Sequence, residues 1–321
     1  MIVVTGAAGF IGSVVVSALN AAGHTDLLLV DTLGAEGKFK NLRAKSYRDI
    51  IDPIAFLEAL PEIAEEIDAI VHLGAITDTS EPDADAVLDR NTHYTQLLAQ
   101  IALENDIRFI YASSASVYGD GALGFSDDDA LTPSFKPLNP YAFSKWLFDA
   151  MAIRHGWTEN IVGLRFFNVF GPNEYHKARM ASVIWHAYKQ VQETGKIKLF
   201  QSHKPEYSDG GQERDFIHVD DLSKVILFFL EHPEANGIFN LGTGKARSFN
   251  DLAAAIFKSL GKEPQIEYIP TPENIRNAYQ YFTEADLTKL RSAGYTDEFL
   301  SLEEGVDRYI QGYLVKDDPY V

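Results

Sequence analysis

MIVVTGAAGFIGS, residues 1–13, places three glycines, Gly6, Gly9 and Gly12, between a β-branched run and an apolar periodic stretch. In a strand–turn–helix context the first glycine permits the tight turn, and the second lets the backbone approach a pyrophosphate. The third lets helix and strand pack closely, and the helix N-terminus then faces the phosphates. Asp31 follows about 20 residues later at the end of the next apolar run. The stretch therefore predicts a dinucleotide site rather than a purely structural turn.

Short apolar runs alternate with amphipathic stretches through the first half of the chain. Helices are expected at roughly 10–22, 53–66, 83–105 and 140–155. The runs expected to be strands are Ile2 to Thr5, Leu27 to Asp31, Ala69 to His72, Phe109 to Ala112 and Val162 to Phe167. Such alternation is typical of βαβ units, and nearly continuous apolar strands suit a sheet covered on both faces. We therefore expect an α/β fold with a Rossmann-like, doubly wound parallel sheet.

The pattern changes after Gly171-Pro172, where a longer helix and the polar loop 201–215 precede further helices and short strands. Residues 1–170 are expected to form the dinucleotide-binding Rossmann domain. Residues 171–321 are expected to form mainly a smaller, mixed α/β substrate-binding lobe. The run GIFNLGTG, residues 237–244, looks like a strand and turn that return to the main sheet. The two parts are therefore expected to be interleaved in sequence.

Composition excludes several classes of function. The 321 residues include 46 acidic and 28 basic side chains, a formal charge of −18, whereas nucleic-acid binding needs a basic surface. The chain has no cysteine, so disulfides, thiolate metal sites and cysteine nucleophiles are excluded, and no metal site is expected. Neither a leader-like start nor an apolar run of about 18 residues is seen, so we expect a cytoplasmic protein without a membrane partner.

A second motif carries acid–base chemistry. Tyr141 and Lys145 stand four residues apart in NPYAFSKW, so both side chains lie on one helix face. A nearby ammonium favours the phenolate and is expected to lower the pKa of the tyrosine. Ser114, in YASSASVYG at the end of a predicted strand, is placed to bond the same substrate oxygen. On its own, a Tyr-x-x-x-Lys pair usually lies on a helix surface without a catalytic role. Together with the glycine turn and the serine, it indicates a catalytic set.

These motifs resemble the short-chain dehydrogenase/reductase superfamily. The resemblance implies hydride transfer between a nicotinamide and a carbinol carbon. Tyr141 would handle the hydroxyl proton and Lys145 would also hold the nicotinamide ribose. RFFNVFGP, residues 165–172, and RDFIHVDD, residues 214–221, resemble the extended branch, which acts on nucleotide sugars. Sugar dehydratases of this superfamily carry an Asp-Glu pair where this chain has Ala115-Ser116, so water elimination is not expected.

From Met1 to about Tyr313 the chain also resembles the ADP-L-glycero-D-manno-heptose 6-epimerases, most specifically in its second half. The matching stretches are KFKNL (38–42), GPNEYHKARMASVIWH (171–186), FNLGTGKARSF (239–249) and EYIPTPENIRNAYQYFTEADLTKLRSAGY (267–295). The resemblance implies inversion at C6 of an ADP-activated heptose through a transient ketone, with a tightly held cofactor that removes and returns the hydride. Tyr141 and Lys177 would then handle the proton on the two faces of that carbon. It also implies a homo-oligomer, a pentamer in this family.

Other readings stay open. The first is another nucleotide-sugar epimerase or reductase of the extended branch, which would act on UDP- or GDP-sugars. The second is a dinucleotide-sensing binding protein without catalysis, which the intact Ser114, Tyr141 and Lys145 disfavour. For Lys177 the plain alternative is a solvated surface lysine.

The resemblance carries further site residues onto this chain. The cofactor contacts it implies are Gly6, Gly9, Phe10, Ile11, Gly12, Asp31, Thr32, Lys38, Leu73, Gly74, Ala75, Thr77, Asn91, Tyr141, Lys145, Val169 and Lys177. The substrate contacts it implies are Ser114, Asn168, Arg179, His186, Arg214 and Tyr279. Arg214 is the candidate diphosphate clamp, since a guanidinium fork suits paired phosphate oxygens. For Asn91, His186 and Tyr279 an ordinary structural role is the alternative.

Two features of the chain bear on specificity. Asp31 would ordinarily bond the ribose hydroxyl of NAD and repel a 2′-phosphate, but Lys38 matches a lysine with which NADP-using relatives offset that charge. The position of a second such lysine in the relatives falls near Pro53 in this chain, and a proline cannot offset a charge. The basic residues that could take its place are Lys40, Arg43, Lys45 and Arg48. We expect NADP, with NAD as the alternative. Arg179 replaces a serine of the relatives and the 201–213 loop is lengthened, which leaves the exact sugar nucleotide open.

Overall fold

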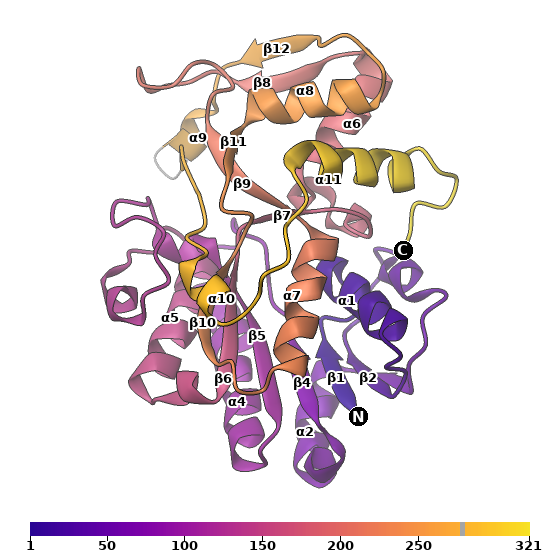
Figure 1. The fold of residues 1–321 in the computed structure, drawn as a ribbon, viewed down its shortest axis with the longest axis vertical. Helices are drawn as coiled ribbons and strands as arrows, with labels where there is room; N and C mark the ends of the chain where they lie inside the picture. The colour runs from indigo at the N-terminus through magenta and orange to yellow at the C-terminus, as the bar shows by residue number, and fades with distance from the viewer. Residues whose placement is uncertain (277–279) are drawn as a thin grey trace.

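The computed structural model describes residues 1–276 and 280–321. Figure 1 shows a large parallel sheet flanked by helices, with a smaller lobe above the carboxyl ends of its strands. The sheet has seven strands in the order β10-β6-β5-β4-β1-β2-β3, all parallel. They are β1 (Ile2–Thr5), β2 (Leu27–Val30), β3 (Asp49–Ile51), β4 (Ala69–His72), β5 (Arg108–Ser114), β6 (Ile161–Phe166) and β10 (Gly237–Leu241).

Helices cover both faces of this sheet. One face carries α1 (Phe10–Ala21), α7 (Val219–Glu231) and α10 (Thr288–Ser292), and the other carries α2 (Pro53–Ile63), α4 (Tyr94–Glu104) and α5 (Pro140–Arg154). The short helix α3 (Ala84–Leu88) precedes α4 and packs on α5. Alternate residues of one strand serve the two faces: Val3 is buried on the α2 side and Val4 on the α1 side.

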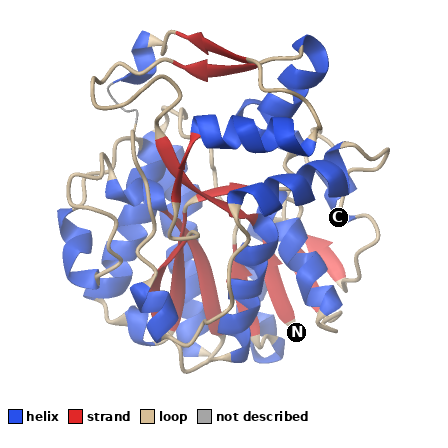
Figure 2. Cartoon of the chain, turned by 45° about the horizontal axis from the view of Figure 1, so that its top comes forward, coloured by secondary structure: helices blue, strands red, loops and turns tan. Residues whose placement is uncertain are grey.

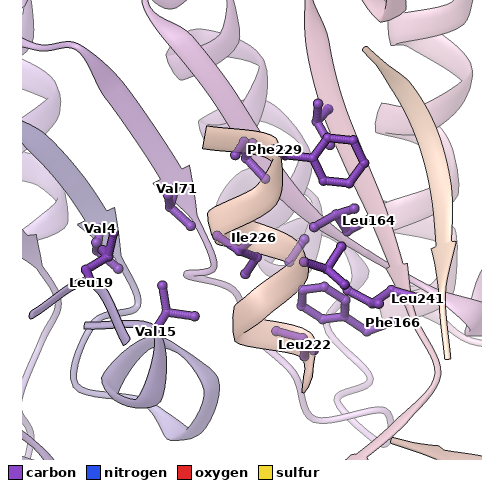
Figure 3. Packing of buried hydrophobic residues seen from close by; sticks show 14 of the residues in the cluster. Val4, Val15, Leu19, Val71, Leu164, Phe166, Leu222, Ile226, Phe229 and Leu241 are labelled. Carbon is purple, nitrogen blue, oxygen red and sulfur yellow. The ribbon is translucent and has the colours of Figure 1, made fainter. Parts of the chain in front are cut away.

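The α1/α7 face shows how the second half of the chain completes the first. In Figure 3, Val15 of α1 and Ile226 and Phe229 of α7 lie against side chains of the sheet, among them Val71 and Leu164. All five are buried. Burial of side chains of this size stabilises by about 1.5–3 kcal/mol each, so α7 belongs energetically to the sheet that residues 1–170 begin.

The predicted fold class is confirmed: the sheet is parallel and doubly wound, and the run at 237–241 returns to it beside β6. The strand β3 was not foreseen, because it has three residues, none of them fully buried, and gives no periodic signal. The predicted 83–105 helix is interrupted by a π-turn at Asp89–His93. The predicted 53–66 helix ends at Ile63 and continues as a 3₁₀ turn, Ala64–Glu66, after Pro61 inside it.

The smaller lobe has its own buried cluster. It also has two short sheets, and its strands lie in the upper part of Figure 2. Its elements are β7 (Asn168–Phe170), α6 (Val183–Thr194), β8 (Ile197–Phe200), β9 (Glu213–His218), β11 (Ala246–Ser248), α8 (Phe249–Ser259), β12 (Ile266–Ile269), α9 (Glu273–Arg276) and α11 (Leu302–Tyr309). We propose residue 170 as the boundary of the dinucleotide-binding unit, with α7, β10 and α10 returning to it. Among the described residues no helix has the length and apolar character to cross a membrane.

Candidate functional site

A cavity of about 690 Å³ lies between the carboxyl ends of the parallel strands and the smaller lobe. In open α/β sheets ligands bind at this edge, where neighbouring crossovers leave in opposite directions, here between β1 and β4. Its wall comes from the turn after β1, the loop after β4, the end of β5, the start of α5, β7 and the segment that leads into α6. The cavity therefore joins the two halves of the chain.

The glycine turn forms one side of this cavity. Gly6 has a φ of +65°, and a Cβ there would lie 2.7 Å from the backbone nitrogen of Gly74. A Cβ on Gly12 would lie 2.1 Å from the carbonyl oxygen of Gly6. The helix α1 begins at Phe10. Its N-cap residue is Gly9, which has no side chain to accept a hydrogen bond from the N–H groups of the first turn. Unpaired N–H groups at a helix start beside a cavity suit a pyrophosphate, so the residues fit a dinucleotide.

The Asp31 carboxylate at the end of β2 is already bonded by the protein. It accepts hydrogen bonds from the backbone N–H of Ala8 at 2.8 Å and of Thr32 at 2.7 Å. Its ion pair with Lys38 has an Nζ–Oδ1 distance of 2.6 Å, and the same ammonium donates to the Thr32 carbonyl at 2.9 Å. The lysine therefore offsets the carboxylate charge where the adenosine ribose of a dinucleotide would lie.

Ser114, Tyr141 and Lys145 all line the cavity. Asn139 caps α5 by accepting from the Ala142 N–H at 2.8 Å, and Pro140 begins the helix, so Tyr141 sits in its first turn. The Lys145 ammonium donates to the Ala112 carbonyl of β5 at 2.8 Å. This bond fixes the helix against the strand that carries Ser114.

The expected lowering of the Tyr141 pKa is not what this structure shows. Burial raises the pKa of Tyr141, and its hydrogen bond with Ser114 opposes that rise. Burial also lowers the pKa of Lys145 to about 8, opposed by Asp149. The sequence pattern places a cation on the same helix face, but it does not reveal that burial dominates the pKa shifts of both groups.

A buried ionic network beneath the site was missed. Arg165 and Asp149 are both fully buried and pair at 2.9 Å. The Asp149 carboxylate also accepts from the Tyr111 hydroxyl at 3.0 Å and the Ser113 hydroxyl at 2.9 Å. The signal that could have found it is spacing: Asp149 stands four residues after Lys145, on the same face of α5.

Lys177 reaches the cavity from the 3₁₀ turn Tyr175–Met180 that precedes α6. Its Nζ donates to the Thr77 hydroxyl at 3.3 Å. Burial lowers the pKa of Lys177, Glu174 opposes that shift and Lys38 adds to it. Glu174 also lines the cavity and was missed, because nothing in the local pattern sets it apart from a surface carboxylate.

Most of the other predicted residues lie on the same wall, and their roles stay predictions. The further ones that line it are Phe10, Ile11, Leu73, Gly74, Ala75, Thr77, Asn168 and Val169. Among the described residues, Thr32, Asn91, Arg179, His186 and Arg214 do not line it. Tyr279 lies outside the described residues.

Each of these five residues bonds to or packs against another residue of the protein. Asn91 is buried behind the wall, where its amide accepts from the Ile76 N–H at 2.8 Å and donates to the Ile76 carbonyl at 3.0 Å. These two bonds hold the loop after β4, and the predicted cofactor contact of Asn91 stays a prediction. Thr32 lies next to Asp31 in sequence, and its backbone bonds that carboxylate.

Three predicted substrate residues have partners on the protein. Arg179 pairs with Asp78 and donates to the Ser80 hydroxyl at 2.6 Å, so it joins the segment before α6 to the loop after β4. His186 packs on Trp185, with 4.9 Å between ring centroids. Arg214 donates to the Gln280 carbonyl and lies over the ring of Phe249, which belongs to the cavity wall.

Residues 2–242 match the model of the NAD dependent epimerase/dehydratase family. The ADP-L-glycero-D-manno-heptose-6-epimerase of Nitratidesulfovibrio vulgaris (strain DP4) is 48% identical over the whole of both chains, and that of Fusobacterium nucleatum is 46% identical over the whole of both. The crystal structure of the Helicobacter pylori ADP-L-glycero-D-manno-heptose-6-epimerase superposes with a TM-score of 0.80 at 27% identity, covering 97% of this chain and 95% of that one. The chain therefore belongs to the NAD dependent epimerase/dehydratase family and, within it, to the family of the ADP-L-glycero-D-manno-heptose-6-epimerases.

Proposed function

We propose that the protein inverts C6 of ADP-D-glycero-D-manno-heptose, giving the L-glycero epimer by transient oxidation and re-reduction. One observation carries the proposal: a single cavity joins the glycine turn, the Ser114, Tyr141 and Lys145 set, and Lys177 from a separate segment. Inversion by oxidation and re-reduction needs a proton-handling group on each face of the carbon. The two relatives with that name, at 46% and 48% identity over full length, support the same substrate.

The residues divide the chemistry as follows. The glycine turn, Gly6, Gly9 and Gly12, would hold a nicotinamide cofactor, whose chemistry when bound would be to accept a hydride from C6 and give it back. The Tyr141 hydroxyl exchanges a proton with the substrate oxygen on one face, and Ser114 bonds that oxygen and orients it. The Lys177 amine serves the other face, and burial lowers its pKa, which makes the amine easier to deprotonate. The order of the two is open. Lys145 holds α5 against β5 through its bond to the Ala112 carbonyl, and it would also hold the ribose of a bound cofactor.

Conversion of ADP-D-glycero-D-manno-heptose by the purified protein, followed at C6 by NMR, tests the proposal. Formation of the L-glycero epimer supports it. Turnover of UDP- or GDP-sugars in place of the heptose would favour the alternative, another epimerase of the extended branch. Net consumption of added cofactor would favour a reductase.

We further propose NADP as the cofactor. The Asp31 carboxylate, which would repel a 2′-phosphate, is bonded to two backbone N–H groups and paired with Lys38. Three of the four basic residues that could replace the second lysine bond to other parts of the protein. Arg43 pairs with Asp318, Lys45 donates to the Val321 carbonyl and Arg48 pairs with Asp26 and Glu66. Lys38 is the basic residue that pairs directly with Asp31 and offsets its charge.

Lys38→Met is expected to weaken NADP binding about 10- to 100-fold, since a hydrogen bond to a charged group contributes about 1.5–3 kcal/mol. NAD binding should change little, because NAD has no 2′-phosphate to be repelled by an unpaired Asp31. Titration of cofactor-stripped protein with each dinucleotide measures both affinities. Equal losses for the two cofactors would contradict the assignment of Lys38 to the 2′-phosphate.

A further inference from the structure

Glu174 closes the short segment of chain that carries Lys177. Its carboxylate accepts from the Ser182 hydroxyl at 2.6 Å and also from the Ser182 backbone N–H. Its own carbonyl accepts from the Lys177 N–H at 2.9 Å. Glu174 thus bonds both the middle and the far end of segment 174–182. These bonds hold the two ends of the segment together beside the cavity.

The same segment contains an unusual backbone conformation. Ala178 has φ 46° and ψ −116°, a region that suits glycine and disfavours a residue with a Cβ. Such strain persists only where the surrounding structure holds it, and it gathers at functional sites. It lies one residue from Lys177, so the direction of the lysine side chain depends on whatever keeps this turn closed.

Capping of α6 alone does not explain a carboxylate at this place. Ser182 is already the N-cap of α6 and accepts from the Trp185 N–H at 3.3 Å. Glu174 is only 1% exposed, and burial raises its pKa to about 7, although Ser182, Tyr309 and Lys177 oppose that rise. A carboxylate that burial penalises so strongly, on the wall of the cavity, indicates a role beyond helix capping.

We propose that Glu174 is a positioning residue for Lys177: its carboxylate, bonded to Ser182, holds the strained turn at Ala178 and thereby keeps the Lys177 amine in the cavity beside Thr77. The inference rests on the proposed function, which gives Lys177 its role in inversion. It adds a residue that acts through the lysine.

The test compares Glu174→Gln with Glu304→Gln. Glu304 accepts the same two bonds, from the backbone N–H and hydroxyl of Ser301, the N-cap of α11, and it does not line the described cavity wall. Glu174→Gln is expected to lower kcat about 10- to 100-fold, as small misplacements of a reacting group do. KM and cofactor occupancy should stay within about twofold, since the lysine acts on the reacting atoms rather than in ground-state binding. Glu304→Gln should leave kcat unchanged.

A second variant separates positioning from general damage. Ala178→Gly removes the strain, so in the Glu174→Gln background it should restore part of the lost kcat. Unchanged kcat in Glu174→Gln overturns the inference, and so does a loss of kcat without any recovery in the double variant. If Glu174→Gln does not fold, Ser182→Ala takes its place, because it removes the hydroxyl that donates to the Glu174 carboxylate. The same changes in kcat and KM are expected for it.

Lys177→Gln, measured alongside, distinguishes this inference from the proposed function. If Lys177→Gln loses turnover and Glu174→Gln keeps it, only the positioning role fails. If Lys177→Gln keeps full turnover, the role proposed for the lysine fails, and the positioning role falls with it.

Discussion

Tyr141→Phe is expected to lower kcat about 10³-fold, because it removes the hydroxyl that exchanges a proton with the substrate oxygen. The ring and its packing stay, and Lys145 keeps its bond to the Ala112 carbonyl, so the cofactor site should survive. Turnover by NMR and cofactor occupancy by absorbance of the denatured protein measure the two effects separately.

Tyr268→Phe is the matched control for this substitution. Tyr268 lies in β12 of the smaller lobe, is 40% exposed, and donates to Asn250 at 3.0 Å, away from the cavity wall. Tyr268→Phe removes a tyrosine hydroxyl, as Tyr141→Phe does, and should keep full turnover. Retention of the wild-type rate by Tyr141→Phe would remove the tyrosine from the mechanism.

The largest expected effect on stability is at Asp149. Asp149→Ala leaves the Arg165 guanidinium fully buried without its carboxylate and leaves the Tyr111 and Ser113 hydroxyls without their acceptor. Removing one partner of a buried ion pair costs about 3–5 kcal/mol, a large part of the stability of a typical domain. Denaturant unfolding of the variant and the wild type at neutral pH measures the difference in the free energy of unfolding.

Arg48 and Asp26 provide the comparison for this prediction. They pair at 3.0 Å, but their side chains are 51% and 55% exposed. Exposed pairs contribute about 0–1 kcal/mol, so Arg48→Ala should change the free energy of unfolding little. A loss at Asp149 no greater than that at Arg48 would show that the buried network does not stabilise the fold.

Local spacing accounts for what the sequence predicts well. The turn at Gly6 to Gly12 and the pair of Tyr141 and Lys145 lie within a few residues of each other in sequence, so one strand–turn–helix or one helix face fixes their geometry. The return of the 237–241 run to the sheet was also predicted, because its apolar pattern suits a buried strand.

Long-range contacts account for what was missed. The sequence pattern does not show that the Asn91 amide, predicted as a cofactor contact, bonds the backbone of Ile76, 15 residues earlier. The sequence pattern also does not show that Arg179, predicted as a substrate contact, pairs with Asp78, about 100 residues away in sequence. The burial that raises the Glu174 pKa comes from packing between separate elements. Sequence patterns fix residue type and local face; the partner that a polar side chain meets is set by the tertiary fold.

The central claim is that the hydrogen on C6 leaves with the cofactor and returns from it. We would incubate the purified protein with ADP-D-glycero-D-manno-heptose in D₂O, without added cofactor, and follow C6 by NMR. The proposed mechanism predicts the L-glycero epimer with protium at C6, because a hydride held by the bound cofactor does not exchange with solvent. Deuterium at C6 of the product would contradict it, since inversion would then proceed by proton abstraction at carbon.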